Sequence, residues 1–422
     1  MKEVLYRLLD EGKTQFHVVA ESERILLEYG GIQLDMAEKW NIEGGRVYYV
    51  KPYPSMLVAF SACTKEHIAR LNIGLSHTDF PMLKIKTSPD MTREGYRMLN
   101  VESYGGLIQE TWFDRPLSVA GKVVVSSDDP FAPEVHLCDF KKAMCVIPSL
   151  APHLRDKSGS EKMNVQKELI PLMGLSGESE SEDRLLSNVA KLLDVDEDNI
   201  LDYDLYLYNM NERCVIGDKD ELILSPRLDN ITSVAALVSA MKNTSDENIN
   251  IIALFDNEEI GSRSKQGADS VLLSQIVERI LGDMNIAEGD RRRLLSQAFM
   301  MSLDVAHGTH PNYPEKSDPT NSIVLGKGVT LKSSASQRYV SDSEAAAVIL
   351  ALSRKYDVPV QRQVNRSGMP GGQTLGPIAS SFIPVRAVDM GVPVLAMHSA
   401  AELGCLKDYE ALCEMVRCVF EE

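Results

Sequence analysis

Two adjacent glutamates, Glu258 and Glu259, follow closely after the apolar run 249–255. Such a run predicts a buried strand, and in an open α/β sheet ligands and chemistry collect at the carboxyl ends of strands. Two neighbouring carboxylates are unfavourable there unless a cation neutralises them, because like charges raise one pKa. With a metal ion present, one glutamate could bind the metal and the other could serve as a general base. The alternative is a solvated acidic loop after the strand.

Four further candidate ligands also follow short apolar runs. They are His77, Asp229, Asp304 and His398. Asp229 could instead only cap the helix expected after it. Imidazole and carboxylate ligands without thiolates suit a hydrolytic Zn²⁺ site, with Mn²⁺ or Co²⁺ as possible substitutes. Together with the glutamates they are too many for one catalytic zinc that keeps an open position. They suit two ions that share a bridging carboxylate.

Asp79 lies two residues after His77, at the expected end of a strand. This spacing puts both side chains on the same side of the pleat. Asp79 could then accept the second imidazole N–H and fix the ring for metal binding. The motif is short, so the alternative of a loop histidine with a capping aspartate stays open.

The elements around these residues predict an α/β protein with one insertion. Residues 91–217 differ from the flanking sequence, because short strand-like segments there are separated by turn residues. This pattern predicts an inserted β-rich domain. The flanking parts, 1–90 and 218–422, would together form the main domain. The acidic run 178–183 is expected to be a solvated loop.

Composition limits the possible partners and compartment. The 422-residue chain has a net charge of −17, which disfavours nucleic acid and anionic membranes as partners, since both require a basic face. No apolar run approaches the ~20 residues needed to span a bilayer, and the charged N-terminus is not typical of a signal peptide. The seven cysteines are odd in number and scattered, which is typical of reduced thiols in a cytoplasmic protein.

The chain resembles the aspartyl aminopeptidase family, which is metallopeptidase family eighteen and consists of co-catalytic di-zinc aminopeptidases. The likeness runs nearly end to end. Besides the candidate ligands in their order, it rests on Phe16-His17, Trp112-Phe-Asp-Arg115, Ser225-Pro-Arg-Leu-Asp-Asn230, His310-Pro-Asn-Tyr313 and Gln337-Arg-Tyr339.

The resemblance implies a mixed-sheet catalytic domain that holds two divalent metal ions per subunit, most simply zinc. One ion would be bound by His77, Asp229 and Asp304. The other would be bound by Asp229, Glu259 and His398, so that Asp229 bridges the two. The enzyme would hydrolyse the N-terminal residue of peptides that have a free N-terminus, and it would favour Asp or Glu at that position.

The resemblance also implies roles for three other residues. Glu258 would be the general base that takes a proton from the metal-bridging water and returns it to the leaving amine. Asp79 would orient His77. His153 would reach the active site of a neighbouring subunit and steady the tetrahedral intermediate. The family dimerises through the inserted domain, and its dimers form a homo-oligomer, a dodecamer that encloses the active sites.

Two departures from the family pattern concern substrate preference. Phe80 stands where the family usually has serine, and Ala401 stands where it usually has arginine. Neither change alters a proposed metal ligand. A preference for acidic residues needs a cationic group, for which Lys332 is a candidate, although it could equally be an ordinary surface lysine. The roles of His307 and His310, close to Asp304 in the chain, stay open.

Other hypotheses share much of this pattern. An aminopeptidase of the same family could prefer neutral residues. A related di-metal deacylase or carboxypeptidase would have the same metal ligands but would not need a free N-terminal amine. An oligomeric scaffold without activity is disfavoured by the complete ligand set and by Glu258, because a scaffold has no need to hold uncompensated carboxylates together.

Overall fold

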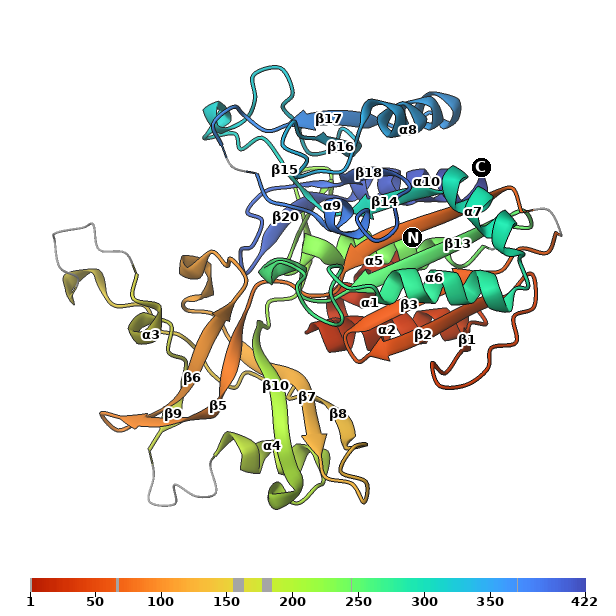
Figure 1. The fold of residues 1–422 in the computed structure, drawn as a ribbon. Helices are drawn as coiled ribbons and strands as arrows, with labels where there is room; N and C mark the ends of the chain where they lie inside the picture. Colours follow the sequence, from red (N-terminus) through yellow and green to blue (C-terminus); the bar gives the residue numbers. More distant parts are fainter. Residues whose placement is uncertain (1, 66–67, 155–162, 177–183, 244, 370) are drawn as a thin grey trace. The chain divides into compact units, whose positions relative to one another are not determined.

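The computed structural model describes residues 2–65, 68–154, 163–176, 184–243, 245–369 and 371–422. The chain forms two compact units (Figure 1). The first contains Met1–Asp79, Arg213–Met397 and Glu402–Glu422, and the second contains Phe80–Glu212 with His398–Ala401. The expected insertion, 91–217, overlaps the second unit. The acidic run 178–183 lies outside the described residues.

A nine-stranded mixed sheet forms the centre of the first unit, in the order β1-β2-β3-β13-β4-β14-β18-β16-β17. The bounds are β1 Ile32–Gln33, β2 Val47–Tyr53, β3 Met56–Ser61, β13 Asn248–Phe255, β4 Arg70–His77, β14 Phe299–Leu303, β18 Arg386–Gly391, β16 Val329–Ser333 and β17 Val360–Val364. The strands β13, β4, β14 and β18 are parallel neighbours. Their carboxyl ends therefore meet at one edge of the sheet.

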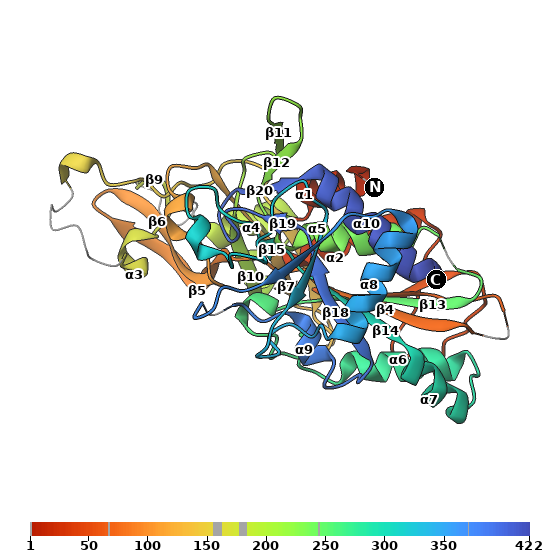
Figure 2. The ribbon, with the colours of Figure 1, turned by 90° about the horizontal axis from the view of Figure 1, so that it is seen from above.

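Helices cover both faces of this sheet. The bounds are α1 Lys2–Glu11, α2 Gln15–Glu28, α5 Leu228–Ala240, α6 Leu272–Asp283, α7 Glu288–Gln297, α8 Ser343–Tyr356, α9 Leu375–Ala379 and α10 Leu406–Glu421. Figure 2 shows α6, α7 and α9 on one face and α1, α2, α5 and α10 on the other. Within the described residues, no helix is both long and apolar enough to cross a membrane.

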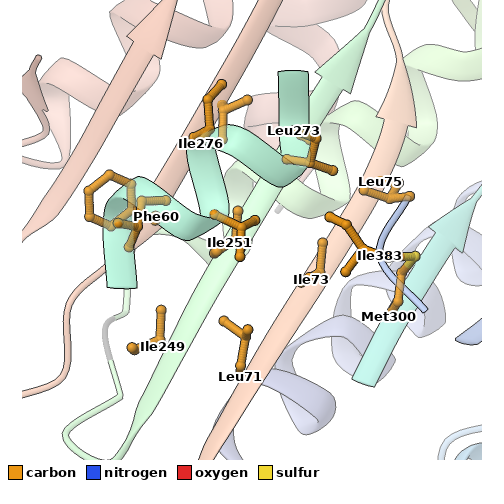
Figure 3. Close-up of a cluster of buried hydrophobic side chains, with 14 of the residues drawn as sticks. Phe60, Leu71, Ile73, Leu75, Ile249, Ile251, Leu273, Ile276, Met300 and Ile383 are labelled. Carbon is orange, nitrogen blue, oxygen red and sulfur yellow. The ribbon is translucent and has the colours of Figure 1, made fainter. Parts of the chain in front are cut away.

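The period-two pattern of β4 explains how the two faces are covered. Leu71, Ile73 and Leu75 belong to the hydrophobic core that also contains residues of α6 (Figure 3). The opposite face of β4 carries Gly74, and a Cβ there would lie 2.4 Å from Cδ2 of Leu237 in α5. This close approach packs α5 against the strand that ends in His77.

The second unit contains a six-stranded antiparallel sheet in the order β8-β7-β10-β5-β6-β9. The bounds are β8 Glu134–Asp139, β7 Leu117–Val125, β10 Ile200–Asn209, β5 Met82–Arg93, β6 Tyr96–Tyr104 and β9 Leu172–Leu175, with the helices α3 Val165–Glu168 and α4 Leu185–Leu193. The first unit has a mixed sheet with helices, and the second is rich in β-strands. The predicted fold class, α/β with a mixed sheet and a β-rich insertion, is therefore confirmed.

Two small sheets complete the first unit. One contains β11 Cys214–Ile216, β12 Leu222–Ser225 and β20 Glu402–Cys405, and the other contains β15 Ala306–His307 and β19 Pro393–Val394. The apolar runs before Asp229 and His398 therefore belong to these small sheets. The runs before His77, Glu258 and Asp304 belong instead to the large sheet, a difference that an apolar run does not reveal.

Candidate metal centre

Three neighbouring parallel strands deliver candidate ligands to one edge of the large sheet. His77 is the last residue of β4 and pairs with Phe255, the last residue of β13. Glu258 and Glu259 follow β13 in a short 3-10 helix, and Asp304 directly follows β14. The arrangement predicted from the apolar runs is therefore present for these four residues.

The ring of His77 lies between three aspartates. Its Nε2 is 3.5 Å from Oδ1 of Asp229 and 3.5 Å from Oδ1 of Asp304. Its Nδ1 is 3.0 Å from the main-chain oxygen of Asp79 and 3.5 Å from the Oδ1 of that residue. The side chain is almost fully buried. The closer contact that orients the ring is thus with a backbone carbonyl.

The carboxylate of Asp79 holds the chain that carries the two glutamates. Its Oδ1 accepts the backbone N–H of Glu258, and its Oδ2 accepts that of Glu259, both at 3.1 Å. The turn ends at Gly261, whose φ of 98° lies in the left-handed region that glycine adopts without strain. Asp79 therefore fixes the position of both glutamates in the main chain.

Hydrogen bonds to three strands hold Asp229 and the residue after it. Its backbone N–H donates to Oε2 of Glu402 at 2.9 Å. The next side chain, Asn230, donates from Nδ2 to the backbone oxygen of Leu303 at 2.8 Å and to Oγ of Ser76 at 3.2 Å. Asp229 has the extended backbone (φ −81°, ψ 105°) that is typical of an N-cap, so the capping role considered as its alternative stays open. The Asp229–Asn230 peptide bond is cis.

These residues fit a divalent metal ion. Ligand atoms of His77, Asp229 and Asp304 lie within 4.8 Å of one another, and so do those of His77, Glu258 and Glu259. Nitrogen and oxygen ligands around a tetrahedral zinc stand about 3.3–3.6 Å apart, since each is about 2.0–2.2 Å from the ion. The contacts of 3.5 Å from His77 Nε2 match this spacing.

Burial and neighbouring charges shift the acid–base properties of the site. Burial raises the pKa of Glu258 to about 8; the charge of His77 opposes this shift, and Asp304 adds to it. Burial also acts to raise the pKa of Asp304, but Lys332 and His77 hold it well below its usual value. Burial acts to lower the pKa of His77, and hydrogen bonds with Asp304 and Asp79 raise it well above its usual value. Bound divalent cations would lower the pKa of Glu258, because opposite charge favours the carboxylate that a general base needs.

Lys332 is buried beside this site. The residue lies on β16 with 2% of its surface exposed, so it is not an ordinary surface lysine. Its Nζ donates to the backbone oxygen of Val305 at 2.7 Å and lies 3.4 Å from Oδ2 of Asp304. The ammonium also stands 5.3 Å from the ring centroid of Tyr339. Its nearest acidic partner is thus a candidate metal ligand.

The remaining predicted residues come from other segments of the chain. His153 is exposed in a 3-10 helix of the second unit, Pro152–Leu154. His398 also belongs to the second unit, and its Nδ1 lies 3.0 Å from the backbone oxygen of Gly106. His307 and His310 line a cavity in the first unit.

Glu402 and Asn230 support the site, but the sequence did not predict these roles. Asn230 belongs to the motif Ser225-Pro-Arg-Leu-Asp-Asn230, and Glu402 directly follows Ala401. Glu402 and Asp229 are far apart in the chain. The pairing of β12 with β20, in which Ser225 lies opposite Glu402, brings them together.

The chain is similar to known aminopeptidases over its whole length. The family model "Aminopeptidase I zinc metalloprotease (M18)" matches residues 8–420. A probable M18 family aminopeptidase 2 from Clostridium novyi is 43% identical over 94% of this chain and 93% of its own. The S. cerevisiae mApe1 dodecamer has a TM-score of 0.82 at 25% identity, with 99% of this chain and 95% of that chain covered. An M18 family aminopeptidase from Thermotoga maritima shares the fold, with a TM-score of 0.86 at 22% identity over 100% of this chain and 95% of that chain.

Proposed function

The chain belongs to the M18 family of zinc aminopeptidases, and from this premise we propose that it holds two zinc ions and releases the N-terminal residue of peptides, with a preference for Asp and Glu. The observation that carries the proposal is the position of His77 Nε2, at 3.5 Å from one oxygen each of Asp229 and Asp304, in a site that also contains Glu258.

Five residues would hold the two ions. His77, Asp229 and Asp304 would bind one of them, and Asp229 would share the other with Glu259 and His398. When bound, the metals would polarise the scissile carbonyl and lower the pKa of water. Mn²⁺ or Co²⁺ could replace zinc, because the ligands are nitrogen and oxygen atoms only.

Side chains of the protein would carry out the proton transfers. Glu258 would take a proton from the attacking water and return it to the leaving amine. Its position beside the candidate ligands His77 and Glu259 supports this role, because a general base must lie within reach of the water it activates. Asp79 would keep Glu258 in place through the backbone N–H that its carboxylate accepts.

We further propose a homo-oligomer built from dimers of the inserted domain, with a dodecamer as the complete assembly. The similar S. cerevisiae protein is described as a dodecamer. In this chain β8 is an edge strand that exposes Val135 and Leu137, and such edges are usually covered. Exposed His153 could then serve a neighbouring subunit. All seven cysteines are free thiols, which supports a cytoplasmic location.

Hydrolysis of a panel of aminoacyl-p-nitroanilides by zinc-loaded protein tests the proposal. We expect the Asp and Glu substrates to be cleaved best and their N-acetylated forms to resist. The variant E258Q should keep its zinc and lose at least about 100-fold in kcat, since a general base contributes that much. The variant E278Q removes an exposed glutamate on α6 and serves as the control.

The other hypotheses predict different results in the same assay. Best cleavage of Leu or Met substrates would leave the mechanism intact and replace the acidic preference with a neutral one. Cleavage of N-acylated substrates alone would show that the aminopeptidase proposal is wrong and would favour a deacylase. The scaffold hypothesis would return if no substrate were cleaved with Zn²⁺, Mn²⁺ or Co²⁺.

A further inference from the structure

A cavity of about 280 Å³ lies within the first unit, and neither the proposed metal ligands nor Glu258 line it. Its walls come from three segments of the chain. They are 307–310, residues within 316–323, and residues within 363–371. His307 and His310, whose roles the sequence left open, stand on the first wall.

The charged lining of the cavity is mainly cationic. Lys316 and Arg366 both line it, and neither has an ion-pair partner among the residues that the structure describes. The carboxylate on the wall is Asp318. Its Oδ1 already accepts hydrogen bonds from the backbone N–H groups and side chains of Thr320 and Asn321. The lining therefore offers two unpaired cations against one carboxylate that its own turn stabilises.

A buried acceptor at the cavity also lacks a partner. Gln363 is only 6% exposed, and its Oε1 has no hydrogen-bond partner within the described part of the chain. Oγ1 of Thr309, on the opposite wall, is in the same situation. A buried acceptor without a donor is unfavourable, and such groups in native proteins require an explanation. Gln363 and Thr309 therefore give the cavity a polar wall, although their oxygens are not themselves accessible from it.

The sheet register connects the cavity to the metal centre. Gln363 pairs with Lys332 across the parallel strands β16 and β17, so both side chains lie on the same face about 4.8 Å apart in strand spacing. Lys332 in turn contacts Asp304. The segment that begins at Asp304 also continues directly to His307 and His310. Gln363, on the cavity wall, is thus on the strand next to Lys332, and Lys332 contacts the candidate metal ligand Asp304.

We propose that this cavity binds a carboxylate of the peptide substrate. Arg366 and Lys316 recognise the charge, and Gln363 forms part of the polar wall beside them. Lys332 is less suited to this recognition, because Asp304 and Val305 already engage its ammonium. The inference rests on the proposed aminopeptidase function and deepens it by naming the residues that select acidic peptides.

Three sources could supply the carboxylate, and a set of peptides separates them. Asp-Ala-Ala-amide presents it on the first residue, Ala-Asp-Ala-amide presents it on the second, and Ala-Ala presents it at the C-terminus. Ala-Ala-Ala-amide carries no carboxylate. The zinc-loaded wild type is compared with R366Q and K316Q. The control is R362Q, which removes an exposed arginine of β17, the strand of Gln363, that does not line the cavity.

We expect R366Q to lower kcat/KM about tenfold or more, or about 1.4 kcal/mol, for at least one carboxylate-bearing peptide, chiefly through KM. Cleavage of Ala-Ala-Ala-amide should stay within about twofold of wild type, and R362Q should leave all four peptides within that range. The peptide that responds identifies the source of the carboxylate. K316Q should lower kcat/KM for the same peptide. Melting temperatures equal to that of the wild type would confirm that the variants fold.

Two results would overturn the inference while leaving the proposed function in place. One is that R366Q and K316Q each cleave every peptide as the wild type does. The other is a loss of equal size for all four peptides, including Ala-Ala-Ala-amide. Failure of the wild type to cleave any peptide with a free amine would instead reject the proposed function, and the inference would fall with it.

Discussion

Asp79 contributes two different groups to the site. Its main-chain oxygen faces Nδ1 of His77, whereas its carboxylate accepts the backbone N–H groups of Glu258 and Glu259. The sequence predicted that the carboxylate would orient the histidine. The carboxylate also lies 3.5 Å from Nδ1 of His77, so a substitution that keeps the backbone oxygen tests which of the two groups orients the ring.

We expect D79N to lower kcat about 10- to 100-fold and to leave zinc affinity within about threefold of wild type. The asparagine keeps the backbone oxygen that faces His77, but its amide NH₂ cannot accept one of the two N–H groups. Zinc affinity is measured by competition with a chromophoric chelator, and kcat is measured on the best anilide. If zinc affinity and kcat fall together, the carboxylate orients the histidine after all.

Lys332 neutralises the buried carboxylate of Asp304. In EDTA, we expect K332M to unfold with about 3 kcal/mol less free energy than wild type, because removing one partner of a buried pair leaves a charge uncompensated. Saturating zinc should narrow this difference, since a bound cation would neutralise Asp304 instead. Urea unfolding measures the difference in free energy between K332M and wild type in EDTA and in saturating zinc.

K327M is the matched control for this experiment, because Lys327 is exposed shortly before the same strand. It should change the free energy of unfolding by less than about 0.5 kcal/mol. A K332M protein as stable in EDTA as the wild type would show that the ammonium does not stabilise Asp304.

At the scale of residues, the sequence was sufficient for side-chain types and insufficient for their contacts. A chain position such as Glu258 after an apolar run suggests a site, because strand ends of an α/β sheet collect ligands. The burial of Lys332 depends on the strands β18 and β17 on either side of it, which lie 28 or more positions along the chain. No local pattern contains that information.

At the scale of elements, the first turn of α10 holds the loop that leads into β16. Asp408 accepts the backbone N–H groups of Gly326 and Gly328 through its two oxygens, both at 2.6 Å. Burial raises the pKa of Asp408 to about 6, although these two hydrogen bonds lower it. The strand that carries Lys332 is thus anchored by a carboxyl group that titrates in an accessible pH range.

This pKa implies a pH-dependent stability. Between pH 4 and pH 6 the folded state would hold a proton on Asp408 that the unfolded state releases, so the contribution of Asp408 to stability falls as pH rises. Relative to D408N in EDTA, we expect the wild-type free energy of unfolding to decrease by about 2 kcal/mol from pH 4 to pH 7. Urea unfolding of both proteins at each pH gives this difference. A difference that does not vary with pH would contradict the raised pKa.

The strands that end in ligands were the most predictable elements. The runs before His77, Glu258 and Asp304 are apolar because β4, β13 and β14 are covered on both faces. The runs before Asp229 and His398 look alike in the sequence, yet they join small separate sheets. Pairing partners decide this difference, and they come from distant parts of the chain.

At the scale of the whole molecule, the sequence predicted one β-rich insertion, and the structure contains a six-stranded antiparallel sheet in that region. Composition alone could not indicate which surface of the insertion meets another subunit. The exposed side chains of Val135 and Leu137 on the edge strand β8 suggest such a surface. The proposed role of His153 depends on that assembly, because the residue would act in a neighbouring subunit.

Subunit complementation tests the assembly and the role of His153 together. H153A and E258Q are each expected to be inactive as pure proteins. In a co-expressed mixture, the E258Q subunit would supply His153 to the intact Glu258 site of an H153A neighbour. Because half of randomly formed symmetric dimers are mixed and each has one complete site, we expect roughly a quarter of wild-type activity to return.

The control for the mixture combines E258Q with an H153A/E258Q double variant, which contains no site with Glu258 and should stay inactive. Mass photometry confirms that each mixture assembles as the wild type does. If the H153A and E258Q mixture assembles but stays inactive, His153 does not act across a subunit boundary. An H153A protein with full activity on its own would remove the residue from the mechanism altogether. Recovery near a quarter would show that each active site is completed by a second copy of the chain, which would explain why an exposed histidine far from the metal ligands in sequence is needed for hydrolysis.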